Sequence, residues 1–254
     1  MDGLRRPLQG VSNILRFNWH FYVLALGGAA AIAGASAWLE GIPRLAGISA
    51  VGVLGSTILV SLLVSWCVYD LSSLYRLEWL EAVAIGPGGK MANIHAGFDE
   101  TSPLLRARYP EAEWTVMDFY DPAKHTEISI KRAREAYPPS PDDVSINTSE
   151  LPISSASMDT VFVVLAAHEI RDKEERHAFF RELHRVLKPE GQAVLVEHLR
   201  DLPNFFAYTL GAFHFISRKA WLAAFARAQL HIAKTITPNP FMTCFVLEKD
   251  GATP

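Results

Sequence analysis

Two long segments near the start of the chain lack Asp, Glu, Lys and Arg, and they restrict the fold more than any other feature. Residues 19–39 form the first segment and residues 48–69 the second. As an α-helix, which rises about 1.5 Å per residue, each segment reaches roughly 30 Å, the thickness of the hydrocarbon core of a bilayer. Residues 40–47 between them suffice only for a tight turn. The pattern predicts a hairpin of two membrane-spanning helices within an anchor at residues 1–80.

Basic residues around the two segments indicate the orientation of the hairpin. Loops on the cytoplasmic side of a membrane are enriched in Lys and Arg. Three arginines precede the first segment, and Arg76 and Lys90 follow the second, whereas the turn contains only Arg44. We therefore expect an integral membrane protein with both termini and residues 81–254 in the cytoplasm. A bacterial inner membrane is the simplest location.

Two other interpretations of the apolar segments are open. The tripeptide Ala35-Ser36-Ala37 resembles the cleavage site of a secretory signal peptide, but an 18-residue lead-in and a second full-length segment argue against cleavage. Two buried helices of a soluble protein would also be apolar. Such helices normally keep one polar face, however, and these segments have none.

The composition excludes several classes of protein. Of the 254 residues, 50% are apolar and 20% are charged, which is too apolar for a disordered chain. No motif recurs at the intervals typical of repeat proteins. A net charge of −3 without a basic cluster argues against nucleic acid as a partner. The two cysteines, Cys67 and Cys244, do not make a disulfide framework.

From residue 81 onwards, short apolar segments alternate with segments of helical pattern. Strands are predicted at residues 91–96, 113–117, 160–165, 192–197 and 243–247, and helices at residues 103–108, 126–137, 173–187 and 217–229. This alternation is typical of an α/β fold, a parallel sheet with helices on both faces. Ligands of such sheets bind beyond the carboxyl ends of the strands, so candidate functional residues are sought there.

The first two strands end in residues that suit a nucleoside ligand. Gly97 follows the first strand, where a glycine lets the backbone approach a ligand closely, although a tight turn would use it equally well. Asp118 ends the second strand, 21 residues later. An acidic residue at this spacing accepts hydrogen bonds from both hydroxyls of a ribose. The alternative is a helix cap, a role that Asp121 before Pro122 fits better.

Several motifs follow one another in an order that resembles a known family. They are Asp118, the segment Ile146-Asn147-Thr148-Ser149-Glu150-Leu151-Pro152, the segment Ser157-Met158-Asp159, the triplet His168-Glu169-Ile170 and the run RELHRVLKPEG at residues 181–191. Together they resemble the class I S-adenosylmethionine-dependent methyltransferases, in particular the type 11 group that includes the quinone- and sterol-methylating enzymes. The resemblance covers about residues 90–250. It implies a Rossmann-like sheet with helices on both faces, and methyl transfer from S-adenosylmethionine.

The resemblance also implies which residues bind the cofactor. They are Asn93, His95, Gly97, Asp118, Asn147, Thr148 and Ala166. The glycine-rich first motif of the family reads Asp-x-Gly-x-Gly-x-Gly. Its four defined positions are occupied here by Asn93, His95, Gly97 and Asp99, so that one glycine remains. Asp99 and Glu100 also place negative charge where the family binds the carboxylate of the cofactor, which weakens binding if both face it.

The ends of the fourth and fifth strands carry the candidates for chemistry. A histidine suits proton removal near neutral pH, so the base is His168 or His198, oriented by Glu169 or Glu197. The alternative is that each of them hydrogen-bonds the backbone across the strand ends. The two His/Glu pairs consist of adjacent residues on strands, whose side chains alternate between faces. We therefore expect no metal site.

An apolar, aromatic segment at residues 204–215 is too short to span a bilayer. It suits either a lid at the membrane surface over a lipophilic pocket or core packing. The sequence thus predicts a membrane-anchored methyltransferase that acts on a quinone, an isoprenoid, a sterol-like molecule or a phospholipid head group. Its partners are the small-molecule acceptor and the bilayer, and not nucleic acid. The alternatives are a non-catalytic scaffold and an adenosyl-binding enzyme of different chemistry.

Overall fold

The computed structural model describes residues 5–251, which form one seven-stranded sheet, helices on both of its faces and a long helical hairpin. The strands are β1 (Gly88–His95), β2 (Glu111–Asp118), β3 (Val144–Ser145), β4 (Met158–Val164), β5 (Leu187–His198), β6 (Leu230–Asn239) and β7 (Met242–Lys249). The helices are α1 (Gln9–Ser36), α2 (Gly41–Trp66), α3 (Ser102–Arg108), α4 (Ile128–Ala136), α5 (Lys173–Val186), α6 (Leu202–Tyr208) and α7 (Arg218–Arg227). Four short turns of other helix types complete them: η1 (Cys67–Leu71), η2 (Glu78–Ala82), η3 (Ala167–Glu169) and η4 (Thr209–His214).

The strand order is β3-β2-β1-β4-β5-β7-β6, in which only β7 runs antiparallel to its neighbours. Every strand and helix expected after residue 81 is present, within a few residues of its expected ends. Three further elements, β3, α6 and β6, were not predicted from the sequence. The edge strand β6 was missed because Lys234 and Pro238 interrupt its apolar pattern, and an edge position tolerates both.

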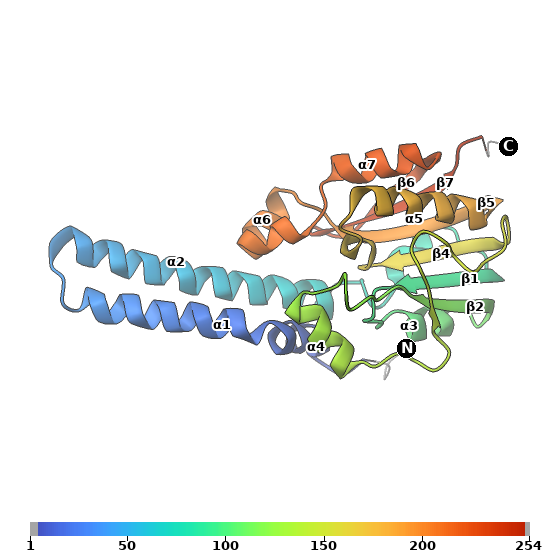
Figure 1. Ribbon diagram of the computed structural model, residues 1–254. Helices are drawn as coiled ribbons and strands as arrows, with labels where there is room; N and C mark the ends of the chain where they lie inside the picture. The colour runs from blue at the N-terminus through green and yellow to red at the C-terminus, as the bar shows by residue number, and fades with distance from the viewer. Residues whose placement is uncertain (1–4, 252–254) are drawn as a thin grey trace.

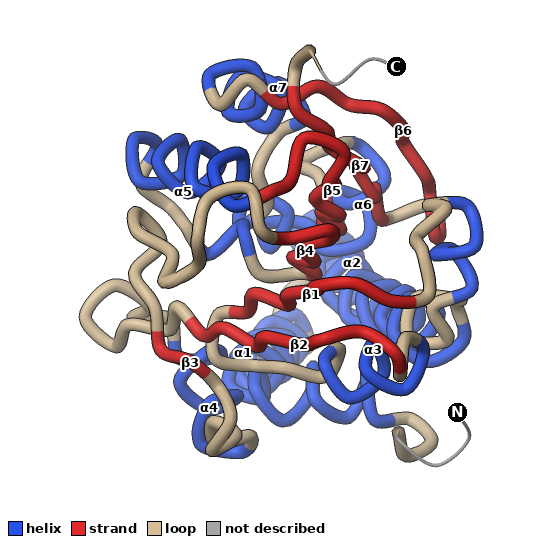
Figure 2. Tube along the Cα trace, turned by 90° about the vertical axis from the view of Figure 1, so that its right-hand side faces the viewer, coloured by secondary structure: helices blue, strands red, loops and turns tan. Residues whose placement is uncertain are grey.

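Helices cover the two faces of the sheet and create two cores (Figure 2). On one face α5 and α7 pack against alternate strand residues such as Val161 and Val163. On the other, α3, η1 and η2 cover the intervening residues, such as Phe162. Leu74 and Leu80 lie fully buried in this second core. The expected anchor at residues 1–80 thus includes residues that pack beneath the sheet.

The hairpin of α1 and α2 projects away from the sheet as a separate arm (Figure 1). Both helices are long and apolar enough to cross a membrane, by length and composition. In their most apolar windows only 6% and 0% of residues are buried, so these are not core helices of the described fold. Large apolar side chains such as Leu24 and Ile42 are exposed by 70% and 82%. Large exposed apolar surfaces of this kind mark sites of contact with a partner protein or a membrane.

The base of the hairpin packs against the carboxyl ends of the parallel strands (Figure 1). Tyr69 donates its hydroxyl to Nε2 of His198, the last residue of β5, at 2.9 Å. Phe17 of α1 packs edge-on against Phe98, which follows β1, with ring centroids 5.6 Å apart. Arg132 of α4 donates to the carbonyl oxygen of Phe17 at 2.8 Å. The hairpin therefore leaves the domain at the edge of the sheet where ligands bind.

Candidate functional site

The loop after β1 is braced by the polar residues at the first and last positions of the family motif, Asn93 and Asp99. Oδ1 of Asp99 accepts hydrogen bonds from the backbone N–H groups of Thr101 and Ser102, both at 2.9 Å, at the start of α3. Nδ2 of the fully buried Asn93 donates to the hydroxyls of Thr101 and Ser102 at 3.1 and 2.8 Å. Asp99 and Asn93 thus brace the beginning of α3.

Glu100 points towards the hairpin. Its carboxylate accepts hydrogen bonds from Gln9 at 2.6 Å and from the hydroxyl of Tyr75 at 3.0 Å, and it pairs with Arg5 at 3.4 Å. The pKa of Tyr75 is raised well above its usual value, mainly by burial and secondly by this carboxylate. The negative charge of Glu100 is thus compensated by the anchor, which removes one of the two obstacles to cofactor binding that the sequence indicates.

The end of β2 carries the predicted ribose-binding carboxylate, and Arg134 of α4 pairs with it. Nη1 of Arg134 lies 2.6 Å from Oδ2 of Asp118, and Oδ1 accepts from the backbone N–H of Tyr120 at 2.9 Å. The Tyr120 side chain covers Gly97, whose φ is +85° and where an added Cβ would lie 2.8 Å from Cβ of Tyr120 and 2.9 Å from its ring. Gly97 is therefore required both by its backbone conformation and by the aromatic ring against it. Neither Arg134 nor Tyr120 is marked by a motif in the sequence.

A cavity of about 260 Å³ opens beside this cluster, between the loop after β1 and the segment after α4. Its lining includes His95, Gly97, Arg134 and Asp143. Nδ1 of His95 accepts from the backbone N–H of Gly97 at 3.2 Å, and its buried Nε2 lacks a hydrogen-bond partner within residues 5–251. This unsatisfied atom and the adjacent cavity fit a polar ligand such as an adenosyl group, provided that Arg134 turns away from Asp118.

The remaining predicted cofactor residues follow β3 and β4. Asn147 is exposed and its Oδ1 accepts from the backbone N–H of Ser149 at 2.9 Å. Thr148 is buried, and its hydroxyl donates to Glu175 of α5 at 2.5 Å. Ala166 is buried directly before η3. All three lie in loops beyond the ends of their strands, but the structure does not link them to Asp118 by hydrogen bonds.

His168 and Glu197 form a close buried pair between the ends of β4 and β5. Nδ1 of His168 lies 2.7 Å from Oε2 of Glu197, and its backbone N–H donates to Oε1 at 3.1 Å. Burial would lower the pKa of His168, but the charge of Glu197 and hydrogen bonds to Glu197 and Glu169 raise it to about 10. Burial would raise the pKa of Glu169, yet His168 and His214 hold it well below its usual value.

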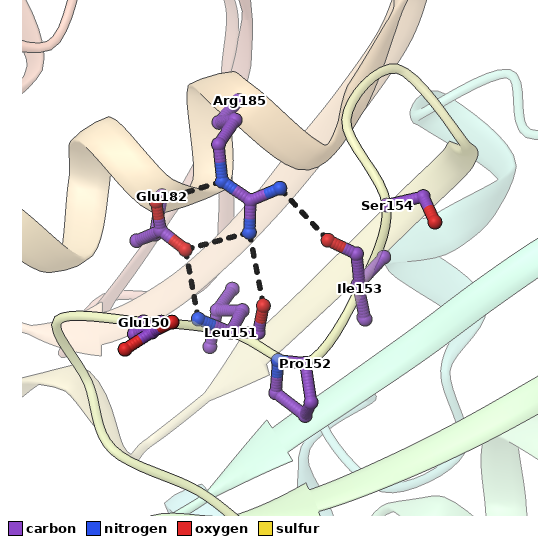
Figure 3. Close-up of a pocket in the computed structure, with 7 residues that line it drawn as sticks. All are labelled: Glu150, Leu151, Pro152, Ile153, Ser154, Glu182 and Arg185. Carbon is purple, nitrogen blue, oxygen red and sulfur yellow. Dashed lines mark hydrogen bonds and ion pairs between the residues drawn. The ribbon is translucent and has the colours of Figure 1, made fainter.

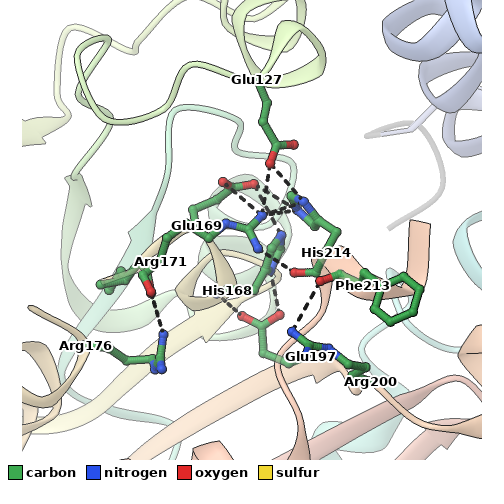
Figure 4. A network of polar contacts seen from close by, with 10 residues as sticks. Glu127, His168, Glu169, Arg171, Arg176, Glu197, Arg200, Phe213 and His214 are labelled. Carbon is green, nitrogen blue, oxygen red and sulfur yellow. Dashed lines mark hydrogen bonds and ion pairs between the residues drawn. The ribbon is translucent and has the colours of Figure 1, made fainter. Parts of the chain in front are cut away.

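His168 and Glu169 lie in η3, a 3₁₀ turn, and point into one cluster with His214 at the end of η4 (Figure 4). This corrects the premise that the two residues lie on a strand and diverge. Nε2 of each histidine lies 3.4 Å from Oε1 of Glu169. Arg171 and Glu127 complete the cluster, with Glu127 Oε1 at 3.2 Å from Nδ1 of His214. Local sequence does not reveal that η4 returns to this point.

His198 takes a different position from His168. Its Nδ1 lies 3.0 Å from Oδ1 of Asn204 and 2.9 Å from the carbonyl oxygen of Phe241, while Nε2 accepts from Tyr69. Its ring stacks on that of Phe215 at 4.7 Å. Burial lowers the pKa of His198 to about 4. Both ring nitrogens are thus engaged, and the residue joins β5, α6 and the hairpin.

A second cavity, of about 540 Å³, lies beside α5 and the loop before β4 (Figure 3). Arg185 donates there to the carbonyl oxygens of Leu151 and Ile153 and pairs with Glu182 at 2.7 Å. Glu182 in turn accepts from the backbone N–H of Leu151. These polar groups satisfy one another, and none of the residues predicted for the site lines this cavity.

The segment at residues 204–215, expected as either a lid or part of the core, forms most of α6 and all of η4. It lies beside α2 (Figure 1). Phe206, Leu210 and Phe213 are exposed by 73%, 79% and 58%, whereas Asn204 and Ala212 are buried. One side of the segment therefore packs on the domain. The other presents apolar side chains next to the hairpin.

Comparison with known proteins agrees with this architecture. Residues 96–195 match the family model described as "Methyltransferase domain". Over 119 residues the chain is 31% identical to a malonyl-[acyl-carrier protein] O-methyltransferase of Laribacter hongkongensis, an alignment that covers 44% of this chain. The chain spans only 39% of the length of that relative.

Solved structures share the fold at low sequence identity. A SAM-dependent methyltransferase from Aquifex aeolicus superposes with a TM-score of 0.50 at 13% identity, over 70% of this chain and 93% of that one. A methyltransferase from Methanosarcina mazei gives a TM-score of 0.48 at 15% identity, over 67% and 97%. By strand order and by the match over residues 96–195, the sheet-forming part of this chain is similar to methyltransferase domains.

Proposed function

We propose that the protein is a membrane-anchored methyltransferase that moves a methyl group from S-adenosylmethionine to a lipophilic small molecule. The observation that carries this proposal is the position of the hairpin base. Tyr69 contacts the end of β5 and Phe17 contacts the loop after β1. An anchor that leaves from this edge holds the mouth of the site against the bilayer. An acceptor dissolved in the membrane then reaches the site without crossing water.

The adenosyl part of the cofactor binds at the ends of β1 and β2. Asp118 accepts hydrogen bonds from the ribose hydroxyls once Arg134 turns away, and Nε2 of His95 donates to the ligand. Asn147 and Thr148 border the adenine, and Ala166 leaves space at the end of β4. Asn93 acts indirectly, because its amide braces α3. The cofactor supplies an activated methyl group, so the protein needs mainly to align the acceptor and exclude water.

The acceptor lies at the ends of β4 and β5, where His168 and Glu169 are available. Glu197 fixes the orientation of the His168 ring. Glu169 accepts a hydrogen bond from the acceptor, and His168 donates one, so that the reacting atom is held in line with the methyl group. His198 serves as a link between the domain and the hairpin, because both of its nitrogens are already engaged.

The apolar surfaces favour a lipophilic acceptor such as a quinone, an isoprenoid, a sterol-like molecule or a phospholipid head group. Phe206 and Leu210 of the α6–η4 segment are exposed beside the hairpin. We place both termini and the methyltransferase domain in the cytoplasm, because arginines flank the base of the hairpin and Arg44 alone occupies its tip.

The test is calorimetric titration of S-adenosylmethionine and S-adenosylhomocysteine into the full chain in detergent, followed by transfer of labelled methyl groups to a membrane lipid extract. We expect micromolar binding that Asp118→Asn weakens by about 10- to 100-fold, since charge-assisted hydrogen bonds are lost. Asp121→Asn, a nearby acidic residue outside the site, is the matched control. Folded wild-type protein that binds neither ligand would favour the non-catalytic scaffold. Binding without methylated lipid would favour different adenosyl chemistry.

A further inference from the structure

The cluster of His168, Glu169 and His214 has the geometry of an incomplete metal coordination shell. One ligand atom from each residue lies within 4.8 Å of the others. Nε2 of His168 and Nε2 of His214 are each 3.4 Å from Oε1 of Glu169. Bonds of about 2.1 Å in a tetrahedral site separate neighbouring ligand atoms by about 3.4 Å. Two of the three spacings therefore match such a site, and the third lies within 4.8 Å.

The outer nitrogens of both histidines face carboxylates, which is the usual support of a histidine that binds a metal. Nδ1 of His168 lies 2.7 Å from Glu197, a residue that is fully buried. Nδ1 of His214 lies 3.2 Å from Glu127. In each case the carboxylate is placed to accept the Nδ1 proton, and Nε2 is directed at Glu169. Nε2 of His214 also lies 2.7 Å from Nη2 of Arg171, which an entering cation must displace. His168 in η3 and His214 in η4 thus both direct Nε2 at the carboxylate of Glu169.

Arg171 occupies the side of the cluster that faces solvent. Its guanidinium donates to the carbonyl oxygen of His214 and lies 3.4 Å from Glu127 and 3.8 Å from Glu169. The side chain is 40% exposed, so it can turn outwards into water. Arg171 supplies positive charge to Glu127 and Glu169 in the absence of a metal. It also competes with any cation that enters.

We infer that His168, Glu169 and His214 form a binding site for a divalent transition-metal ion such as Zn²⁺, with Arg171 as a displaceable competitor. A set of two imidazoles and one carboxylate favours such an ion over Mg²⁺ or Ca²⁺, which prefer oxygen ligands. Three protein ligands leave one position open. That position lies at the ends of β4 and β5. If the proposed methyl transfer holds, this position receives an oxygen atom of the acceptor, in place of the direct hydrogen bonds of His168 and Glu169 to it, and the ion lowers the pKa of that group.

The experiment uses the full chain in detergent, prepared without a polyhistidine tag, stripped with chelator and kept free of S-adenosylmethionine. Zn²⁺ binding is measured by calorimetry, and Co²⁺ binding by the absorption bands that report its coordination geometry. We expect one ion per chain, with a tetrahedral or five-coordinate Co²⁺ spectrum. Mg²⁺ should not compete. Because cofactor and acceptor are absent, failure here is separate from failure of the proposed methyl transfer.

Variants identify the ligands. Glu169→Gln and His214→Ala should each weaken Zn²⁺ binding at least tenfold, whereas His231→Ala, which alters an exposed histidine beside Glu248 and Asp250, should leave it unchanged. Arg171→Gln should tighten binding about tenfold, because a competing positive charge is removed. The inference is overturned if folded wild-type protein binds no Zn²⁺, or if Glu169→Gln and His214→Ala bind it as tightly as wild type. It is also overturned if Arg171→Gln weakens binding.

Discussion

At the scale of single residues, the pairing of Asp118 with Arg134 controls the proposed cofactor site. The two side chains lie 2.6 Å apart, and Asp118 is almost completely buried. A ligand that uses this carboxylate must displace the guanidinium, so part of the binding free energy is spent on that exchange. Arg134 also donates to the carbonyl oxygen of Gly97 at 3.3 Å. One side chain thus links the loop after β1 to the end of β2.

Replacement of Arg134 by Ala should therefore have opposite effects on binding and on stability. S-adenosylmethionine should bind more tightly, because Asp118 no longer has a competing partner. The free energy of unfolding should fall by about 2 kcal/mol, because a buried carboxylate loses its counter-ion. Calorimetry and thermal unfolding in detergent measure the two quantities. Weaker binding in a folded variant would instead mean that Arg134 contacts the cofactor directly.

His198 should make stability depend on pH. Its folded-state pKa of about 4 lies below the ordinary value of 6.5, because burial disfavours the charged ring and the charges of His168 and His214 oppose it further. Tyr69, Asn204 and the Phe241 carbonyl face the ring. The unfolded state therefore binds more protons between these two pKa values. Stability is retained above pH 6.5 and is lost as the pH falls towards 4.

The expected loss is about 3 kcal/mol over that range. Thermal unfolding between pH 7 and pH 4 measures it in wild type, in His198→Asn and in His231→Asn. The variant at residue 198 should show a shallower fall with decreasing pH, while the variant at the exposed residue 231 should follow wild type. Identical slopes in all three proteins would contradict the role given to His198.

At the scale of elements, the start of α1 depends on a residue in η1, the turn that follows α2. The residue before this helix, Leu8, lacks a capping side chain. Asp70 supplies the cap: its two carboxylate oxygens accept from the backbone N–H groups of Gly10 and Val11 at 2.8 and 2.9 Å. Gly10 permits this approach, because an added Cβ would lie 2.3 Å from Cβ of Tyr69. The base of the hairpin is thus fixed by contacts between both of its helices.

Asp70→Ala should lower the free energy of unfolding by about 2 kcal/mol, because two N–H groups lose their acceptor and the helix loses a favourable charge. Glu40→Ala, at the exposed tip of the hairpin, is the matched control and should have no effect. Chemical unfolding in a mild detergent compares the two. Equal stability of both variants would show that the cap does not hold the hairpin base.

At the scale of the whole molecule, the exposed hairpin and the α6–η4 segment define one apolar side (Figure 1). The proposed topology puts residue 40 on the far side of the membrane and residue 188 on the cytoplasmic side. In a Cys67→Ser background, Glu40→Cys should react with an impermeant maleimide only in right-side-out vesicles. Lys188→Cys should react only in inverted vesicles. Labelling of both positions from the same side would contradict a spanning hairpin.

Some features of this protein depend only on residues that are neighbours in the sequence, and the sequence by itself determined these features. The length and apolarity of residues 19–39 and 48–69 indicate two long exposed helices, and the alternation after residue 81 indicates an α/β sheet. Asp118 was expected at the end of a strand and lies there, and His168 lies in the turn that follows β4. Such predictions succeed because hydrophobic periodicity is a local property of the chain.

Only the tertiary structure decided which side chains meet. Arg134 of α4 pairs with Asp118, and residues of the anchor compensate the charge of Glu100. His214 packs against His168, which lies 46 residues earlier in the sequence. His168 and Glu169 point into one cluster because they lie in a 3₁₀ turn and not on a strand. These contacts depend on strand order and on the paths of loops. Both are set by packing between segments distant in sequence, which local periodicity does not encode.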